Sequence, residues 1–313
     1  RVLTHKIAHL IEKDLVSASN ILAVTFTNKA AQEMKKRVSK LLKDKNTSVN
    51  LGTFHSICAR ILRREIHHLG YTSDFSIFDV KDQVSLVKVV LEAMEIPKNY
   101  VTPQEVRHKI SYFKNKLIHP DEAQSKAHLV IEKTYAEIYK NYQKALFENN
   151  ALDFDDLLIL PLQLFEKNPK VLEQYRQDWK YILVDEYQDT NKPQFILIKY
   201  LAGSHHQVCV VGDDDQSIYG WRGADIRNIL DFEKTFKNCE VFKLEKNYRS
   251  SGHILEAASS VVKNNVDRAP KELKANNGLG EKLGLIETHD EMEEADAVVN
   301  ALEKEIKLEK RNF

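Results

Sequence analysis

The chain has 313 residues, 42% of them hydrophobic and 29% charged, which fits a soluble globular protein long enough for two domains. Its 46 basic and 46 acidic side chains cancel, so a surface for nucleic acid can exist only as a local patch or groove. Three scattered cysteines, no signal peptide and no apolar run near the roughly 20 residues of a membrane span exclude a disulfide scaffold and a membrane protein, and predict a cytoplasmic location.

The N-terminal part alternates helical and strand patterns. Residues 1–13 carry a helical apolar stripe, and we expect a piece of a longer protein because the chain opens on Arg1 inside this pattern. Strands are predicted at 21–26 and 49–54, each followed by a helix, at 28–42 and 57–62. This β-α-β-α order predicts a parallel sheet.

The pattern changes at about residue 82. Residues 83–150 contain several helical stretches and no convincing strand, so we expect a helical insertion. A helix is predicted over 153–165, after which the sheet resumes. The remaining predictions are strands at 181–186, 207–211 and 240–244, a helix at 251–262, a loop at 276–280 and a charged helix at 290–311.

The stretch 181–191 places two carboxylates after a short apolar run. Tyr181 to Val184 reads as a strand buried on both faces, and Asp185 and Glu186 follow it. Ligands of open α/β sheets bind at the carboxyl ends of the strands. Asp185 could hold Mg²⁺ on a nucleotide and Glu186 could orient or activate water, whereas the plainer alternative is a solvated strand end.

A second stretch, 211–225, follows another apolar strand and joins polar and aromatic groups. Gln216 can donate and accept hydrogen bonds, which suits a phosphate oxygen or an attacking water. Tyr219, Trp221 and Arg222 are planar groups in a glycine-flanked loop, as base stacking requires. The alternative is a buried loop anchor.

Two more stretches combine basic, aromatic and small polar residues. Arg249 follows a predicted strand and could reach a γ-phosphate, with Tyr248 beside it to stack on a base; the alternative is a surface arginine. The strand end at 25–28 offers small polar groups and free N–H groups to a phosphate. There, Phe26 is either core or a stacking platform. The candidates are Thr25, Phe26, Thr27, Asn28 and, after the next strand, His55.

These stretches occur together and in one order. Thr-Phe-Thr-Asn-Lys-Ala-Ala, Thr-Phe-His-Ser, Val-Asp-Glu-Tyr-Gln-Asp-Thr-Asn, Gly-Asp-x-Asp-Gln-Ser-Ile-Tyr-x-Trp-Arg-Gly-Ala and Asn-Tyr-Arg-Ser resemble the UvrD/Rep/PcrA family of superfamily-one DNA helicases. The resemblance covers nearly the whole chain and includes the sequence between the motifs, such as residues 152–157.

The resemblance implies a role for each site residue. Asp185 is the Mg²⁺ carboxylate, Glu186 the catalytic carboxylate and Gln216 the γ-phosphate sensor that couples to DNA. Arg249 is the arginine finger and Tyr248 stacks on adenine. The residues matching the single-strand path are Phe26, His55, Tyr219, Trp221 and Arg222. ATP and Mg²⁺ are the implied cofactors. The implied partners are single-stranded DNA, junctions of single- and double-stranded DNA, and accessory proteins of repair or replication.

The family fold implies an α/β chain with a RecA-like P-loop NTPase parallel sheet. Residues 1–82 and 151–248 would form the first RecA-like domain, 83–150 its helical insertion and 249–313 the beginning of a second RecA-like domain. The family's Walker A sequence is absent, and the 313 residues contain no Gly-Lys pair, so we expect the fragment alone to be ATPase-deficient.

Three functions stay open at this point. The first is an ATP-dependent 3′→5′ DNA helicase or translocase. The second is a non-catalytic DNA-binding or regulatory module, which the absent Walker A would favour. The third is the motor subunit of a helicase–nuclease complex.

Overall fold

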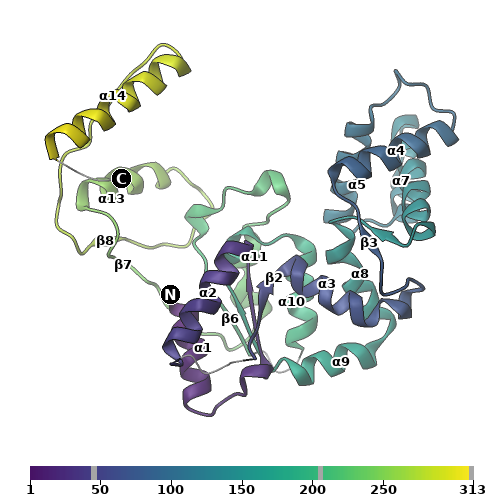
Figure 1. Cartoon of the computed structure of the whole chain (residues 1–313), viewed down its shortest axis with the longest axis horizontal. Helices are drawn as coiled ribbons and strands as arrows, with labels where there is room; N and C mark the ends of the chain where they lie inside the picture. The colour runs from purple at the N-terminus through teal and green to yellow at the C-terminus, as the bar shows by residue number, and fades with distance from the viewer. Residues whose placement is uncertain (44–47, 204–206, 310–313) are drawn as a thin grey trace. The chain divides into compact units, whose positions relative to one another are not determined.

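The computed structural model describes residues 1–43, 48–203 and 207–309, the side chains of 307–309 excepted. The chain divides into two compact units, Arg1–Cys239 and Glu240–Phe313 (Figure 1). The predicted domain limits at residues 82, 150 and 248 remain predictions.

A four-stranded parallel sheet in the order β2-β1-β5-β6 forms the centre of the first unit. Val24 aligns with Gly52 on one side and with Val184 on the other, so β1 and β5 are the inner strands. The sheet confirms the predicted α/β fold with a parallel sheet. The strands are β1 (Ile21–Thr25), β2 (Asn50–Thr53), β5 (Tyr181–Val184) and β6 (Val208–Val210).

Helices cover both faces of this sheet (Figure 1). Alternate residues of β1 enter different cores: Ile21 and Ala23 pack with α1 and α2, whereas Leu22 and Val24 pack with α3, α8 and α10. Burial on both faces explains why the inner strands β1 and β5 read as continuous apolar runs. The covering helices are α1 (Val2–Glu12), α2 (Asn28–Leu41), α3 (Phe54–Glu65), α8 (Asp156–Lys167), α9 (Pro169–Asp178) and α10 (Lys192–Ala202).

The predicted helical stretches of 83–150 form a separate cluster with its own apolar core, which includes Val87, Val106 and Tyr142. Two short strands, β3 (Ser76–Ile77) and β4 (Ala151–Leu152), pair in parallel and bring the two ends of this insertion together. Its helices are α4 (Val80–Ala93), α5 (Pro103–Asn115), α6 (Pro120–Lys126) and α7 (Val130–Glu148).

Short helical turns make the remaining connections of the first unit. They are η1 (Ala18–Asn20), η2 (Ile66–Leu69), η3 (Tyr187–Asp189), η4 (Asp214–Gln216), η5 (Gly220–Arg222), α11 (Arg227–Leu230) and α12 (Phe232–Thr235). None of the helices in the described ranges is long and apolar enough to cross a bilayer.

The second unit contains a two-stranded parallel pair, β7 (Lys246–Asn247) with β8 (Lys274–Ala275), and the helices α13 (Gly252–Val262) and α14 (Glu291–Glu309). The predicted strand at 240–244 is wrong, because no strand in the described residues pairs with it and Phe242 is 79% exposed. An apolar run becomes a strand only where a neighbour takes its backbone hydrogen bonds. Residues 310 and 311 of the predicted helix lie outside the described residues.

Candidate active site and nucleic-acid interface

Two adjacent carboxylates end the inner strand β5. The Asp185 N–H donates to the Val24 carbonyl of β1 at 3.0 Å, which fixes this half-buried residue at the carboxyl edge of the sheet. Glu186 leaves the strand with a φ of 51°, a left-handed conformation that costs a non-glycine residue about 1–2 kcal/mol. The bend holds Asp185 in the sheet edge and leaves the Glu186 side chain exposed.

The electrostatics of this pair suit a divalent cation. Burial, and then the charge of Glu186, raise the pKa of Asp185. The same two causes raise the pKa of Asp189 to about 6. Neither Asp185 nor Glu186 forms an ion pair with a residue in the described ranges. Two uncompensated carboxylates are the oxygen donors that Mg²⁺ prefers, so these residues fit the implied ion.

Gln188 connects the exposed carboxylate to the next strand end. Its Nε2 donates to Glu186 Oε2 at 3.0 Å, and its Oε1 accepts from the Asp213 N–H at 3.0 Å. Gln216 Nε2 then donates to Asp213 Oδ2 at 2.6 Å. Gly212 makes room, because a Cβ there would lie 2.5 Å from Gln188 Oε1. A continuous hydrogen-bonded chain thus joins Glu186 to Gln216.

An aromatic cluster lies on the same edge of the sheet. The rings of Phe26, after β1, and Tyr219, after β6, stack with centroids 5.5 Å apart. Trp221 lies 6.5 Å from Tyr219, and the Arg222 guanidinium lies 4.5 Å from the Trp221 ring. Trp221 is 76% exposed, so it is a free planar surface and not a buried anchor.

The loop that carries Trp221 is fastened to the segment after β5. Thr190 O accepts from the Asp225 N–H at 3.0 Å and from Asn228 Nδ2 at 2.9 Å, and Asn191 forms an antiparallel bridge with Ala224. The carboxylate site and the aromatic cluster are therefore joined by backbone as well as by side chains.

Comparison with protein families gives this geometry a context. Residues 1–237 match the UvrD/REP helicase N-terminal domain, and residues 242–312 match the UvrD-like helicase C-terminal domain. The chain belongs to the UvrD/REP helicase family. It is 48% identical over 304 residues to the ATP-dependent DNA helicase PcrA of Staphylococcus aureus and 47% identical to that of Staphylococcus epidermidis. Each match covers 97% of this chain and 42% of the relative, so the chain spans about two fifths of the relatives' length.

Within this UvrD-family chain, the strand-end residues at 25–28 differ in exposure. Thr25 is fully buried and its hydroxyl donates to the Thr27 carbonyl at 3.1 Å, so it shapes the turn from inside. Thr27 Oγ1 caps α2 by accepting from the Ala30 N–H. Thr27 and Asn28 are exposed beside the partly buried Phe26.

His55 lies in the first turn of α3, after the carboxyl end of β2. Its ring packs on Phe154 with centroids 4.5 Å apart, and Phe154 is itself 54% exposed. Burial lowers the pKa of His55 to about 4, so the imidazole is neutral near pH 7. It can offer a phosphate a hydrogen bond but not a charge.

Tyr248 and Arg249 belong to the second unit, where both are exposed. Asn247 Oδ1 accepts from the N–H groups of Arg249 and Ser250 at 2.9 and 2.8 Å, which fixes the turn between β7 and α13. The roles of Tyr248 and Arg249 stay predictions.

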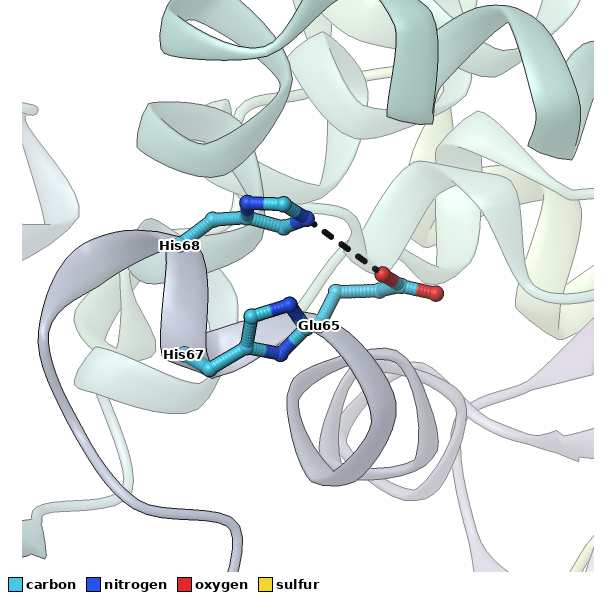
Figure 2. Close-up of side chains that lie close together, drawn as sticks. All are labelled: Glu65, His67 and His68. Atoms are coloured by element: carbon cyan, nitrogen blue, oxygen red, sulfur yellow. Dashed lines mark ion pairs between the residues drawn. The ribbon is translucent and has the colours of Figure 1, made fainter.

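Glu65, His67 and His68 offer possible ligand atoms within 4.8 Å of one another (Figure 2). Glu65 ends α3, twelve residues from Thr53 at the strand edge, or about 18 Å along the helix axis, and His67 and His68 follow in η2. His68 Nε2 and Glu65 Oε2 are 3.9 Å apart. Both histidines are exposed, and a histidine is favourable near the carboxyl end of a helix. We therefore interpret the group as surface side chains that stabilise the end of α3, and not as a metal site.

Sequence reasoning singled out Glu186 and Gln216 but missed Gln188, which connects them. The only sequence signal was its place inside the Asp-Glu-Tyr-Gln-Asp-Thr-Asn stretch. Gln188 is uncharged and fully buried, so its role is visible only from its two hydrogen-bond partners, and one of them, Asp213, lies 25 residues away.

Proposed function

We propose that the protein of which this chain forms part is an ATP-dependent DNA helicase that moves 3′→5′ on single-stranded DNA and unwinds duplex at junctions. The family and the name shared by the relatives support helicase action. The polarity rests on the resemblance of the motifs. The exposed aromatic cluster supports sequence-tolerant binding, because every base has a face on which Trp221 can stack.

ATP would bind against the carboxyl edge of the sheet. Asp185 would hold Mg²⁺, which would offset phosphate charge, and Glu186 would orient or activate the attacking water. Gln216 would contact the γ-phosphate. From the second unit, Tyr248 would stack on adenine and Arg249 would stabilise charge on the transferring group.

The observation that carries the proposal is the hydrogen-bonded chain from Glu186 through Gln188 and Asp213 to Gln216. Gln216 lies three residues before Tyr219, which stacks on Phe26. A change at the γ-phosphate would therefore reach the bases through one short rigid path.

The 313 residues alone would hydrolyse ATP poorly, because they lack the Gly-Lys-[Ser/Thr] group that grips phosphates and the ion. We place the whole protein in the cytoplasm, in DNA repair or replication, where accessory proteins could direct it to junctions.

The test uses the full-length protein with Glu186→Gln. Nucleotide binding should persist, because the amide keeps the shape of the side chain, while hydrolysis should fall by about 10²–10⁴-fold. Glu173→Gln is the matched control, since Glu173 is an exposed helix residue paired with Arg176. Unchanged hydrolysis in Glu186→Gln would remove Glu186 as the catalytic carboxylate. A wild-type protein that binds DNA without hydrolysing ATP would favour the non-catalytic module instead.

A further inference from the structure

The last turn of α5 leaves the core of the helical insertion and contacts the sheet domain. Leu117, two residues beyond the helix, packs against the apolar core beneath the sheet, and its φ is 57°. Lys116 O accepts from Lys192 Nζ, at the start of α10, at 3.2 Å. The insertion therefore meets the sheet domain through this turn as well as through the chain connections near β3 and β4.

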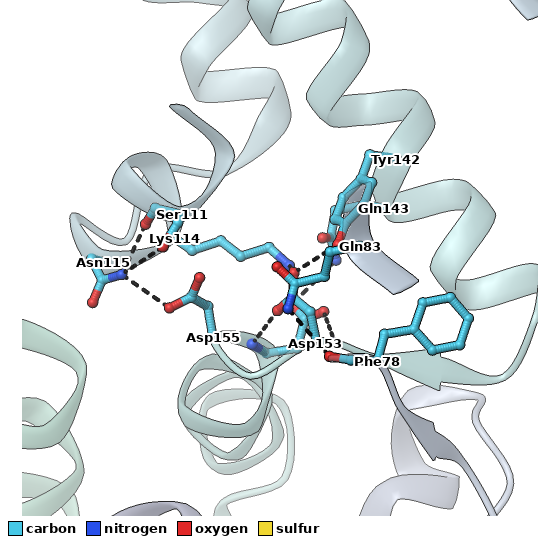
Figure 3. A network of polar contacts seen from close by, with 10 residues as sticks. Phe78, Gln83, Ser111, Lys114, Asn115, Tyr142, Gln143, Asp153 and Asp155 are labelled. Carbon is cyan, nitrogen blue, oxygen red and sulfur yellow. Dashed lines mark hydrogen bonds and ion pairs between the residues drawn. The ribbon is translucent and has the colours of Figure 1, made fainter. Parts of the chain in front are cut away.

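Lys114 anchors the turn inside the protein (Figure 3). Its side chain is fully buried, and its Nζ lies 2.7 Å from Asp153 Oδ2 and 2.7 Å from Asp156 Oδ1. Tyr142 of α7 also donates to Asp153, at 3.1 Å. The Lys114 cation thereby connects α5 to the start of α8. The Tyr142 hydroxyl connects the same start of α8 to α7.

Asn115, the next residue, uses both ends of its side-chain amide. Nδ2 donates to Asp155 Oδ1 at 3.0 Å and to the Ser111 carbonyl at 2.9 Å. Oδ1 accepts from Asn191 Nδ2 at 2.9 Å. A Cβ built on Gly223 would lie 3.5 Å from the same Oδ1, so the end of the Trp221 loop also lies against Asn115.

Asn191 connects Asn115 to the segment after β5, which begins with Asp185 and Glu186. It lies five positions after Glu186 and caps α10, with its Oδ1 accepting from the Gln194 N–H at 3.1 Å. Because its oxygen is used in the cap, only its Nδ2 is directed to Asn115. The contact thus joins the segment after β5 to the insertion.

We propose that Asn115 is a positioning residue that ties the helical insertion to the segment after Asp185–Glu186 and to the end of the Trp221 loop. A shift of residues 185–191 during ATP turnover is passed through Asn191 and Asn115 to the insertion. Loss of the contact leaves hydrolysis intact and separates it from duplex unwinding. This inference rests on the proposed helicase function.

The test uses the full-length protein with Asn115→Ala, with Asn191→Ser, which keeps a capping oxygen but loses the Nδ2 donor, and with both. Asn141→Ala is the matched control, because Asn141 is a partly buried insertion residue whose side chain, among the described residues, donates to Met94 Sδ and the Glu137 carbonyl within the insertion. Basal ATP turnover, KM for ATP and base pairs unwound per ATP are measured for each.

Asn115→Ala should keep basal kcat and KM within about twofold and lose about tenfold in base pairs unwound per ATP. Asn191→Ser should also lose coupling, and the double variant should lose no more than Asn115→Ala alone, because the Asn115–Asn191 hydrogen bond is the contact that both substitutions remove. If Asn115→Ala does not fold, Asn191→Ser tests the same hydrogen bond from its other side.

Unwinding per ATP that matches the Asn141→Ala control would overturn the inference, as would losses that multiply in the double variant. A wild-type protein without ATPase activity would overturn the proposed function and this inference with it. Normal ATPase activity with normal coupling in Asn115→Ala overturns the inference alone.

Discussion

Replacing Lys114 with Met should destabilise the junction between the insertion and the sheet domain in a pH-dependent way. The substitution keeps an unbranched side chain of similar length and removes the charge that faces Asp153 and Asp156. Breaking a buried ion pair from one side typically costs about 3–5 kcal/mol, because the partner charge stays buried.

The pKa directions of the two carboxyls say which of them carries this cost. Burial works to raise the pKa of Asp153, but Lys114 and the hydrogen bonds hold it below the usual value. Burial, followed by Asp153, raises the pKa of Asp156 to about 7. Asp153 is therefore the carboxyl that Lys114 keeps ionised.

Without Lys114, the folded protein avoids a buried charge by protonating Asp153. From an unfolded pKa of about 3.9, this costs up to about 4 kcal/mol at pH 7 and about 1.5 kcal/mol at pH 5. The sign follows from linkage: a carboxyl whose folded pKa is raised loses stability as the pH rises. The loss in Lys114→Met should therefore shrink on acidification.

Urea unfolding of wild type and variant at pH 5 and pH 7 measures the loss, and hydrogen exchange of α5 and α7 locates it. Lys114→Met with Asp153→Asn and Asp156→Asn should recover most of the stability, since all three groups are then neutral. Lys140→Met, at an exposed pair with Asp121, is the control and should change little. A Lys114→Met protein as stable as wild type, or equally weakened at both pH values, would refute the reasoning.

Two further substitutions test the site. Gly212→Ala places a Cβ 2.5 Å from Gln188 Oε1 and 2.8 Å from Ile229 Cδ1, so both side chains must shift, and it should reduce ATP turnover in the full-length protein. Gly220→Ala, where a Cβ meets nothing within 4 Å, should leave turnover near wild type. Equal turnover in the two variants would remove Gln188 as the connection. Burial lowers the pKa of His55 to about 4 in the folded protein. The unfolded state therefore binds a proton at His55 first, and the free energy of unfolding should fall as the pH falls from about 6.5 towards 4. Urea unfolding should show wild type losing stability relative to His55→Asn as the pH falls over this range, and a stability difference that is constant with pH would contradict the neutral imidazole.

The sheet was predictable because its inner strands are buried on both faces and are followed by polar residues. The run Tyr181 to Val184 followed by Asp185 contains both signals, and the structure places it as an inner strand. The strand predicted at 240–244 failed because the same apolar signal does not report whether a neighbouring strand is present to pair with it.

The partners of the buried charges were not predictable. Asp153 and Asp156 read as the beginning of a helix, which the structure starts only at Asp156, and Lys114 reads as one lysine among many on a helix. The pairing spans 39 residues to Asp153 and 42 to Asp156, and it depends on how α5 meets α8. The same holds for Asn115 and Asn191, 76 residues apart, because amide side chains carry no periodic or charge signal.

The central claim is that nucleotide turnover is coupled to bases held by the aromatic cluster. ATP hydrolysis by full-length wild type and Trp221→Ala, each with and without single-stranded DNA, tests it most directly. Trp221 is 76% exposed, and in the proposed function it would stack on a base at about 1–3 kcal/mol, so the variant should lose DNA-stimulated turnover and keep basal turnover. Equal loss of basal and DNA-stimulated turnover would contradict the coupling, as would full stimulation by DNA in Trp221→Ala.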